Sequence, residues 1–189
     1  MYGILGEDAS DAETLKVLVR RLADNPRLPV IAKGYGGCGR MLSDGARDLQ
    51  FFKKRRLTHF IVCHDADGPD PKPKKDLVMR QIVQPSGSAE DCCIVIPVQE
   101  LEAWILADIE CASHIFTSWH PGPVQNPEGI VKPKETLERL SEDRRRKRRY
   151  KHALHNEKIA WHLDLAKVEE KCPAFRILVA FVKKTAPTR

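Results

Sequence analysis

The sequence lacks the patterns that mark disulfide frameworks, zinc sites, secretion and membrane insertion. Its six cysteines are scattered, and no two of them form a Cys-x-x-Cys pair, so neither a zinc site nor a disulfide scaffold is predicted. No apolar run approaches the roughly 20 residues that span a bilayer. The first residues reach a carboxylate, Glu7, too early for a secretory signal. We therefore expect a cytoplasmic protein with no membrane partner.

Positive charge is concentrated in one segment. The chain has 32 Lys and Arg against 26 Asp and Glu, a formal charge of +6. Residues 132–151 hold 10 basic and 4 acidic residues, which accounts for the whole excess. Such a run either neutralises phosphates of a nucleic acid or forms a solvated linker. The candidate nucleic-acid contacts in it are Arg144, Arg145, Arg146, Lys147, Arg148, Arg149 and Lys151.

Strand and helix patterns alternate over the first half of the chain. This alternation predicts an α/β fold with a mainly parallel sheet of about four strands, flanked by helices. Ser10 and Glu13 have the spacing of a capping box and predict the start of the first helix, which should stop at Asn25-Pro26. The predicted strands are 2–6, 28–32, 58–63 and 92–98, and further helices are expected at 41–56, near 76–83 and from 99–108.

The pattern changes after residue 110. A Pro/Gly-rich stretch, the basic run, which is expected to be helix-like, and two predicted helices, 157–171 and 174–184, follow in this part. We expect residues 1–110 to form the α/β core and residues 111–189 to form a basic, mainly helical extension packed on it. A chain of 189 residues suits one such domain.

Acidic side chains follow three of the predicted strands. Glu7 follows the first strand, Asp65 and Asp67 follow the third, and Glu100 and Glu102 follow the fourth. Parallel sheets bind ligands at the carboxyl ends of their strands. Carboxylate oxygens suit Mg²⁺ or Mn²⁺, and clustered carboxylates repel one another unless a cation is present. The cluster therefore predicts a metal site, although Asp65-Ala66-Asp67-Gly68 taken alone is also a good turn sequence.

The glycine-rich turn from Gly34 to Arg40 lies between a predicted strand and helix. Its backbone N–H groups could hold a phosphate, with Arg40 assisting. The Walker pattern and the complete dinucleotide fingerprint are absent, so a flexible turn is the alternative. His64, beside the acidic motif, could contact phosphate or be incidental.

Two pairs of segments carry a resemblance to known families. Ile4-Leu5-Gly6-Glu7 before a helix, with a later strand that ends in Asp65-Ala66-Asp67-Gly68, resembles the Toprim fold of topoisomerases, primases and overcoming-lysogenization-defect-type nucleases. Residues 99–108 and 171–175 resemble a narrower Toprim-like bacterial family, domain-of-unknown-function family 4276, whose members are often encoded beside an ATPase. The resemblance implies that Glu7 is a general acid/base, Asp65 and Asp67 are metal ligands, and Glu102 and Glu100 are auxiliary acids.

Three functional hypotheses follow. The first is Mg²⁺- or Mn²⁺-dependent phosphoryl transfer on nucleic acid, DNA or RNA, by a Toprim-type nuclease that serves bacterial defence with an ATPase partner. The second is a non-catalytic Toprim-like module that binds nucleic acid or a partner protein. The third is a haloacid-dehalogenase-type phosphatase that uses the Asp65 motif as nucleophile. Pro69 in place of a hydroxyl residue, and the motif's place after the third strand, weigh against it.

Overall fold

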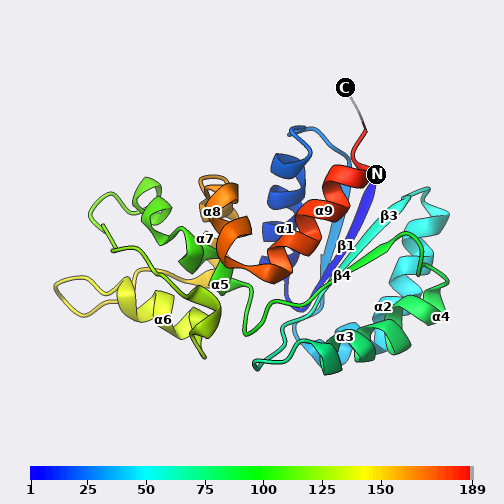
Figure 1. Cartoon of the computed structure of the whole chain (residues 1–189), viewed down its shortest axis with the longest axis horizontal. Helices are drawn as coiled ribbons and strands as arrows, with labels where there is room; N and C mark the ends of the chain where they lie inside the picture. The colour runs from blue at the N-terminus through cyan, green and yellow to red at the C-terminus, as the bar shows by residue number, and fades with distance from the viewer. Residues whose placement is uncertain (188–189) are drawn as a thin grey trace.

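A single parallel sheet forms the centre of the computed structural model, which describes residues 1–187. Each strand pairs in parallel with its neighbours, in the order β2-β1-β3-β4 (Figure 1). The expected α/β class with about four parallel strands is confirmed. The strands are β1 (Tyr2–Gly6), β2 (Val30–Gly34), β3 (His59–Cys63) and β4 (Cys92–Val95).

Helices cover both faces of this sheet (Figure 1). On one face lie α1 (Ala9–Leu22) and α9 (Pro173–Thr185), and on the other α2 (Cys38–Lys54), α3 (Lys72–Val78) and α4 (Gln84–Ser86). Successive side chains of β3 point to opposite faces. Ile61 and Cys63 therefore belong to the buried cluster under α1 and α9, while Phe60 and Val62 pack into the cluster under α2.

The first helix begins earlier than its sequence pattern indicates. Asp8 is its N-cap, since Asp8 Oδ1 accepts the N–H of Asp11 at 2.9 Å and Asp11 Oδ2 accepts the N–H of Asp8 at 3.2 Å. The predicted capping box of Ser10 and Glu13 is therefore wrong. Asp8 follows the end of β1 and has an extended backbone. The cap therefore lies two residues ahead of Ser10.

Other element ends also differ from the expected ranges. β4 stops at Val95 rather than at residue 98, because Pro97 has no N–H for a strand ladder. The helix expected near 76–83 begins at Lys72 and continues through a π-helical turn, η1 (Met79–Val83), into α4. The helix expected at 157–171 is two helices, because Asp164 caps the second one.

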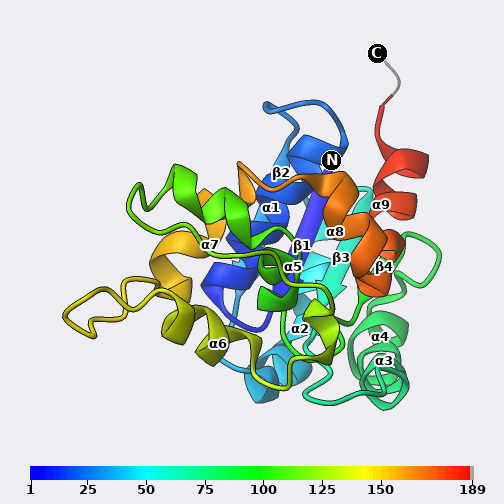
Figure 2. The same cartoon turned by 60° about the vertical axis from the view of Figure 1, so that its left-hand side comes forward.

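The C-terminal extension is mainly helical, as expected, and packs on the core. Its helix α7 (His152–Ala160) lies against α1 (Figure 2), and one hydrophobic cluster contains residues of both parts. Residues 188 and 189, which the extension was predicted to include, lie outside the described part of the chain. The helices from residue 102 onward are α5 (Glu102–Ala107), η2 (Ile109–His114), η3 (Pro127–Gly129), α6 (Pro133–Leu140), α7 (His152–Ala160) and α8 (Leu165–Lys171), followed by α9.

The first strand and the last helix meet beside the amino end of the sheet (Figure 1). Tyr2 Oη and Thr185 Oγ1 share a hydrogen bond of 2.7 Å, and the Tyr2 ring packs edge-on against Phe181. Within residues 1–187, no helix has both the length and the apolar character needed to cross a bilayer.

Candidate acidic site at the strand ends

Glu7 and Asp65 meet at the carboxyl ends of two neighbouring strands. β1 and β3 pair directly, with Leu5 opposite Val62, so the residues that follow them emerge side by side. Glu7 Oε1 accepts the backbone N–H of Asp65 at 2.8 Å. The first carboxylate is thus fixed against the backbone that carries the second.

The imidazole of His64 holds the Glu7 carboxylate in one orientation. Its side chain is 1% exposed, and its Nδ1 lies 2.8 Å from Glu7 Oε1 and 2.7 Å from the carbonyl oxygen of Asp65. Both neighbours are acceptors, so Nδ1 carries the proton and donates to them. His64 Nε2 is buried without a partner. The sequence alone allows two roles for His64, a contact with phosphate or no role in the site. In the structure, His64 holds the Glu7 carboxylate in position.

The glycine-rich turn holds Glu7 by its backbone. The carbonyl oxygen of Glu7 accepts the N–H groups of Tyr35 at 3.2 Å and Gly37 at 2.8 Å. This close approach requires glycine at residue 34, since a Cβ there would lie 2.2 Å from the carbonyl carbon of Asp8. Two N–H groups of the turn are therefore engaged by Glu7, while Arg40 is exposed on the first turn of α2.

Asp65 lies in a field of other carboxylates. Its Oδ1 accepts the N–H of Leu101 at 3.1 Å, which joins the end of β3 to the segment after β4. Burial raises the pKa of Asp65 well above its usual range, and the charges of Asp11, Glu102 and Glu7 raise it further. A positive charge nearby would favour its ionised form.

Asp11, which sequence analysis missed as a site residue, faces the same group of carboxylates from α1. Only 6% of it is exposed. Burial, followed by the charges of Asp8 and Glu102, raises the pKa of Asp11 to about 8. Its short distance from Glu7 along the chain was the available signal, because the first turn of a helix that follows a strand lies at the carboxyl end of that strand.

Glu102 is the most deeply buried acid of the group. Its Oε1 accepts the Nδ2 hydrogen of Asn156 at 3.1 Å, and Oε2 is buried without a partner. Tyr150 Oη in turn donates to Asn156 Oδ1. Burial raises the pKa of Glu102, and Lys134 and Asn156 partly offset this effect. The extension therefore supplies the side chains that hold this core carboxylate.

Glu100 and Glu102 occupy different places. Glu100 is partly exposed, and its Oε2 accepts the backbone N–H of Lys134 at 2.8 Å, at the start of α6. Lys134 Nζ lies 3.8 Å from Glu102 Oε1. Glu102 thus joins the group of buried acids, while Glu100 anchors α6 beside it. We call Asp11, Asp65, Glu100 and Glu102 the acidic cluster.

Asp67 lies apart from the acidic cluster. Its side chain is 64% exposed, and its Oδ2 pairs with Lys74 Nζ at 2.9 Å. Alternation along a strand would send Asp65 and Asp67 to the same side, but β3 ends at Cys63 and Asp67 has a φ of 52°. The chain turns at this residue, and the carboxylate turns with it.

The residues fit a hard divalent cation by their donor chemistry. Within residues 1–187, no group of three or more His, Cys, Asp and Glu side chains is arranged to hold a metal ion. Mg²⁺, however, typically rests on one or two carboxylates together with waters and substrate phosphates. Asp65 and Glu102 are the residues that would hold it, since Glu102 Oε2 is a buried oxygen without a partner. Glu7 lies beside Asp65.

The basic run forms an extended loop between α6 and α7 (Figures 1 and 2). Glu142 and Arg148 form an antiparallel bridge across it, and Asp143 accepts the N–H groups of Arg145 and Lys147. The loop is therefore built as a turn rather than as the helix-like segment that the sequence indicated. It borders a cavity of about 600 Å³.

The basic side chains of this loop divide into two groups. Arg148 is paired with Glu138 at 3.1 Å and Glu142 at 3.3 Å, while Arg149 donates to Ser118 Oγ and lies over the Phe116 ring. These contacts fix the loop against α6 and against the segment that contains Phe116 and Ser118. The exposed side chains at the tip are Arg144, Arg145, Arg146 and Lys147, and Lys151 is exposed at the N-cap of α7.

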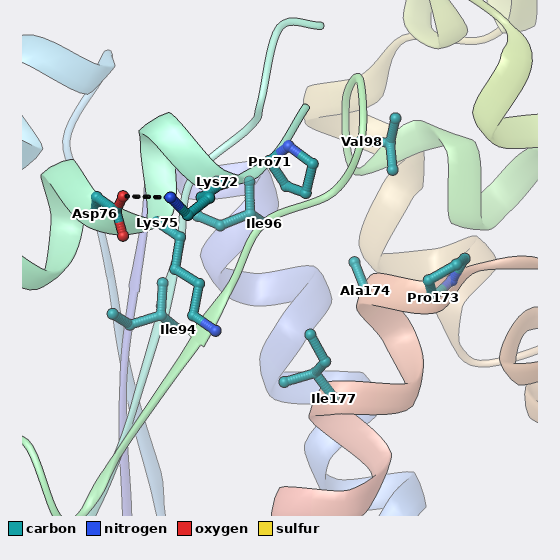
Figure 3. A pocket seen from close by; sticks show the side chains of 10 residues that line it. All are labelled: Pro71, Lys72, Lys75, Asp76, Ile94, Ile96, Val98, Pro173, Ala174 and Ile177. Atoms are coloured by element: carbon teal, nitrogen blue, oxygen red, sulfur yellow. Dashed lines mark ion pairs between the residues drawn. The ribbon is translucent and has the colours of Figure 1, made fainter. Parts of the chain in front are cut away.

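An apolar cavity of about 430 Å³ lies beside the edge strand β4, between α3 and the start of α9 (Figure 3). Ile94, Ile96 and Ile177 line it, and Lys72 pairs with Asp76 at its rim at 4.0 Å. None of the acidic cluster lines this cavity. It is a separate apolar feature of the fold.

Comparison with known proteins identifies a family but no characterised relative. A family model described as Domain of unknown function (DUF4276) matches residues 6–183. No curated protein and no solved structure matched the chain. The match includes Glu7 and Asp65 at the strand ends and Lys134 and Asn156 of the extension.

Proposed function

Since the chain belongs, as expected, to the family described as Domain of unknown function (DUF4276), and this description names no activity, we propose an activity from the site itself. The proposed activity is divalent-metal-dependent phosphoryl transfer on nucleic acid, most simply hydrolysis by a Toprim-type nuclease. The observation that carries this proposal is the fixed contact of Glu7 with Asp65 at adjacent strand ends, together with the Glu102 carboxylate, which acts on Asp65 and whose Oε2 is buried without a partner.

Different residues of the site would bind the metal ion and transfer the proton. Asp65 and Glu102 would hold Mg²⁺ or Mn²⁺, which supplies Lewis-acid stabilisation of the phosphate when bound. Glu7 Oε1 is fixed by His64 Nδ1 and by the N–H of Asp65. A carboxylate held in one orientation can accept or deliver a proton at its other oxygen, which is the role of a general acid/base.

The basic loop supports nucleic acid as the substrate class. Its exposed side chains at residues 144–147 can contact backbone phosphates without breaking the pairs that Arg148 makes. Counterion release on such contacts drives association with any sequence. A cytoplasmic location and a role in bacterial defence beside an ATPase belong to the same proposal.

Cleavage assays with matched variants test the proposal. Plasmid, linear duplex, single-stranded DNA and RNA are incubated with the purified chain and Mn²⁺, with and without chelator. Glu7→Gln and Asp65→Asn should each lower the rate by about 100-fold or more, and chelator should abolish cleavage. Asp70→Asn, an exposed acid of the same loop, should cleave like the wild type.

Equal cleavage by the wild type and by both site variants would assign the activity to a contaminant. Asp67→Asn distinguishes the inner and outer carboxylates, since Asp67 is paired with Lys74 outside the acidic cluster. We expect its loss to be smaller than that of Asp65→Asn.

A non-catalytic module that binds nucleic acid or an ATPase is the second candidate. The observation in its favour is that Asp67 is turned toward Lys74 rather than toward Asp65. Calorimetry with Mn²⁺ and co-purification with the protein encoded by the neighbouring gene separate the two candidates. Tight binding of that partner, without metal affinity or cleavage, would favour the module.

A further inference from the structure

Lys134 is a positively charged side chain set among the carboxylates of the acidic cluster. It comes from the start of α6, far from those acids along the chain. Glu100 holds its backbone, through the 2.8 Å hydrogen bond from Lys134 N to Glu100 Oε2. The anchor fixes where the lysine stem begins, and the stem then leads toward Glu102.

The ammonium group acts on several acids at once. Lys134 Nζ lies 3.8 Å from Glu102 Oε1, and its side chain is 29% exposed. Burial lowers the pKa of Lys134, but the charges of Glu102, Glu100, Asp11 and Asp65 outweigh burial and raise it. Lys134 Nζ thus pairs directly with Glu102, and acids from α1 and the end of β3 also favour its charged form.

We infer that Lys134 is the resident cation of the acidic cluster and that it competes with a divalent metal ion for Asp65 and Glu102. This inference rests on the proposed function only in that a divalent cation enters this site. An ammonium beside the same carboxylates repels an incoming metal ion, and it must move away before that ion can bind Glu102 without this repulsion.

The side chain has room for that movement. Because part of the Lys134 side chain is exposed while Glu102 is buried, its ammonium can leave the carboxylates for solvent without moving its backbone anchor. Lysine carries its charge on a flexible stem and binds phosphate as a point charge. Displaced from Glu102, the ammonium would stand at the opening of the site, where a substrate phosphate carries the opposite charge.

Calorimetric titration of the full-length protein with MnCl₂ tests the competition. Lys134→Met removes the charge and keeps an apolar stem, and we expect it to bind Mn²⁺ at least about tenfold more tightly than the wild type. Lys134→Arg keeps the charge and should bind Mn²⁺ as weakly as the wild type. Lys132→Met, an exposed lysine at the N-cap of the same helix, should leave the affinity unchanged.

Thermal unfolding of the same variants gives a second readout. Without metal, Lys134→Met should unfold at a lower temperature than Lys132→Met, because the buried carboxylates have lost their cation. Saturating Mn²⁺ should reverse the order of the two variants. If Lys134→Met does not fold, Lys134→Gln, which keeps a polar end group, replaces it in both measurements.

The competition and the proposed nuclease activity can fail separately. If Lys134→Met binds Mn²⁺ no more tightly than the wild type, or if neither binds it, the inference is overturned whatever the cleavage assay shows. If Lys134→Met binds Mn²⁺ more tightly but no nucleic acid is cleaved, the competition stands and the proposed nuclease does not.

Discussion

The carboxylate of Glu7 accepts the backbone N–H of Asp65 at 2.8 Å, which joins the ends of β1 and β3. From β1 the chain moves outward to β2, and it then crosses back to β3 on the other side of β1. Open parallel sheets bind their ligands at such a change of direction, outside the carboxyl ends of the strands. The contact therefore lies where the topology opens a crevice.

Replacing Gly34 by alanine should displace Glu7. The added Cβ would lie 2.2 Å from backbone atoms of Asp8, and backbone cannot yield as a flexible side chain can. We expect a loss of about 2 to 3 kcal/mol in the free energy of unfolding, measured by urea denaturation. Gly39→Ala adds a Cβ with nothing within 4 Å and serves as the control. Equal effects of the two substitutions would contradict the close packing of this turn.

The stability of the protein should fall as pH rises through the range in which Asp11 keeps its proton. Burial, with Asp8 and Glu102, raises its pKa from 3.8 to about 8 in the folded state. Between about pH 4 and pH 8 the folded state therefore holds a proton that the unfolded state has released, and stability decreases across this window. Above pH 8 the decrease from Asp11 is complete.

Asp11→Asn should remove this part of the pH dependence, because the amide oxygen can still accept the Asp8 N–H. We expect the stability of the variant relative to the wild type to increase by at least about 1.4 kcal/mol between about pH 5 and pH 8. Denaturant unfolding at each pH measures the difference. The exposed Asp70→Asn is the control, and curves for Asp11→Asn and the wild type that stay parallel would refute the shift.

Asn156 should contribute more to stability than Tyr150. Asn156→Leu leaves the buried Glu102 Oε1 without its amide donor and Tyr150 Oη without its acceptor, which should cost about 3 kcal/mol. Tyr150→Phe removes a single hydrogen bond and should cost about 1 kcal/mol. Chemical denaturation of both variants gives the order. A larger loss for Tyr150→Phe would contradict this role of Asn156.

Substitutions in the basic loop should change the salt dependence of nucleic-acid binding. We expect Arg144→Gln, Arg145→Gln and Arg146→Gln together to lower the slope of log affinity against log salt by about 0.9 for each lost phosphate contact. Fluorescence anisotropy with a labelled duplex in metal-free buffer measures the slope. The control combines Arg27→Gln, Lys54→Gln and Lys184→Gln, three exposed basic residues elsewhere. The same slope change in both triple variants would remove the loop from the interface.

Much of the sheet and the contact of Glu7 with Asp65 could be predicted from the sequence. Apolar segments separated by helical periodicity locate strands, and parallel strands end at one edge, so acids that follow neighbouring strands can be expected to meet. Each strand is predicted from its own residues, and the position of the acid after it depends little on the conformation of the loops.

The remaining contacts depend on information that local patterns do not carry. Asp67 departs from the expected direction because its backbone has a positive φ, which alternation along a strand cannot anticipate. Lys134 and Asn156 reach Glu102 from helices of the extension, and their approach depends on how those helices pack. No spacing between residues in the sequence predicts how closely Lys134 or Asn156 approaches Glu102.

The hydrogen bond between Tyr2 and Thr185 has a consequence for synthesis at the ribosome. The first strand emerges early, but its partner on α9 emerges only when nearly the whole described chain has been translated. Until then the face of the sheet that α9 covers lacks this helix, and Glu102 lacks Asn156 until a further 54 residues have been translated. A nascent chain therefore carries Glu7, Asp65 and Glu102 before it can hold them in place, and the site is complete only after Asn156 has been translated.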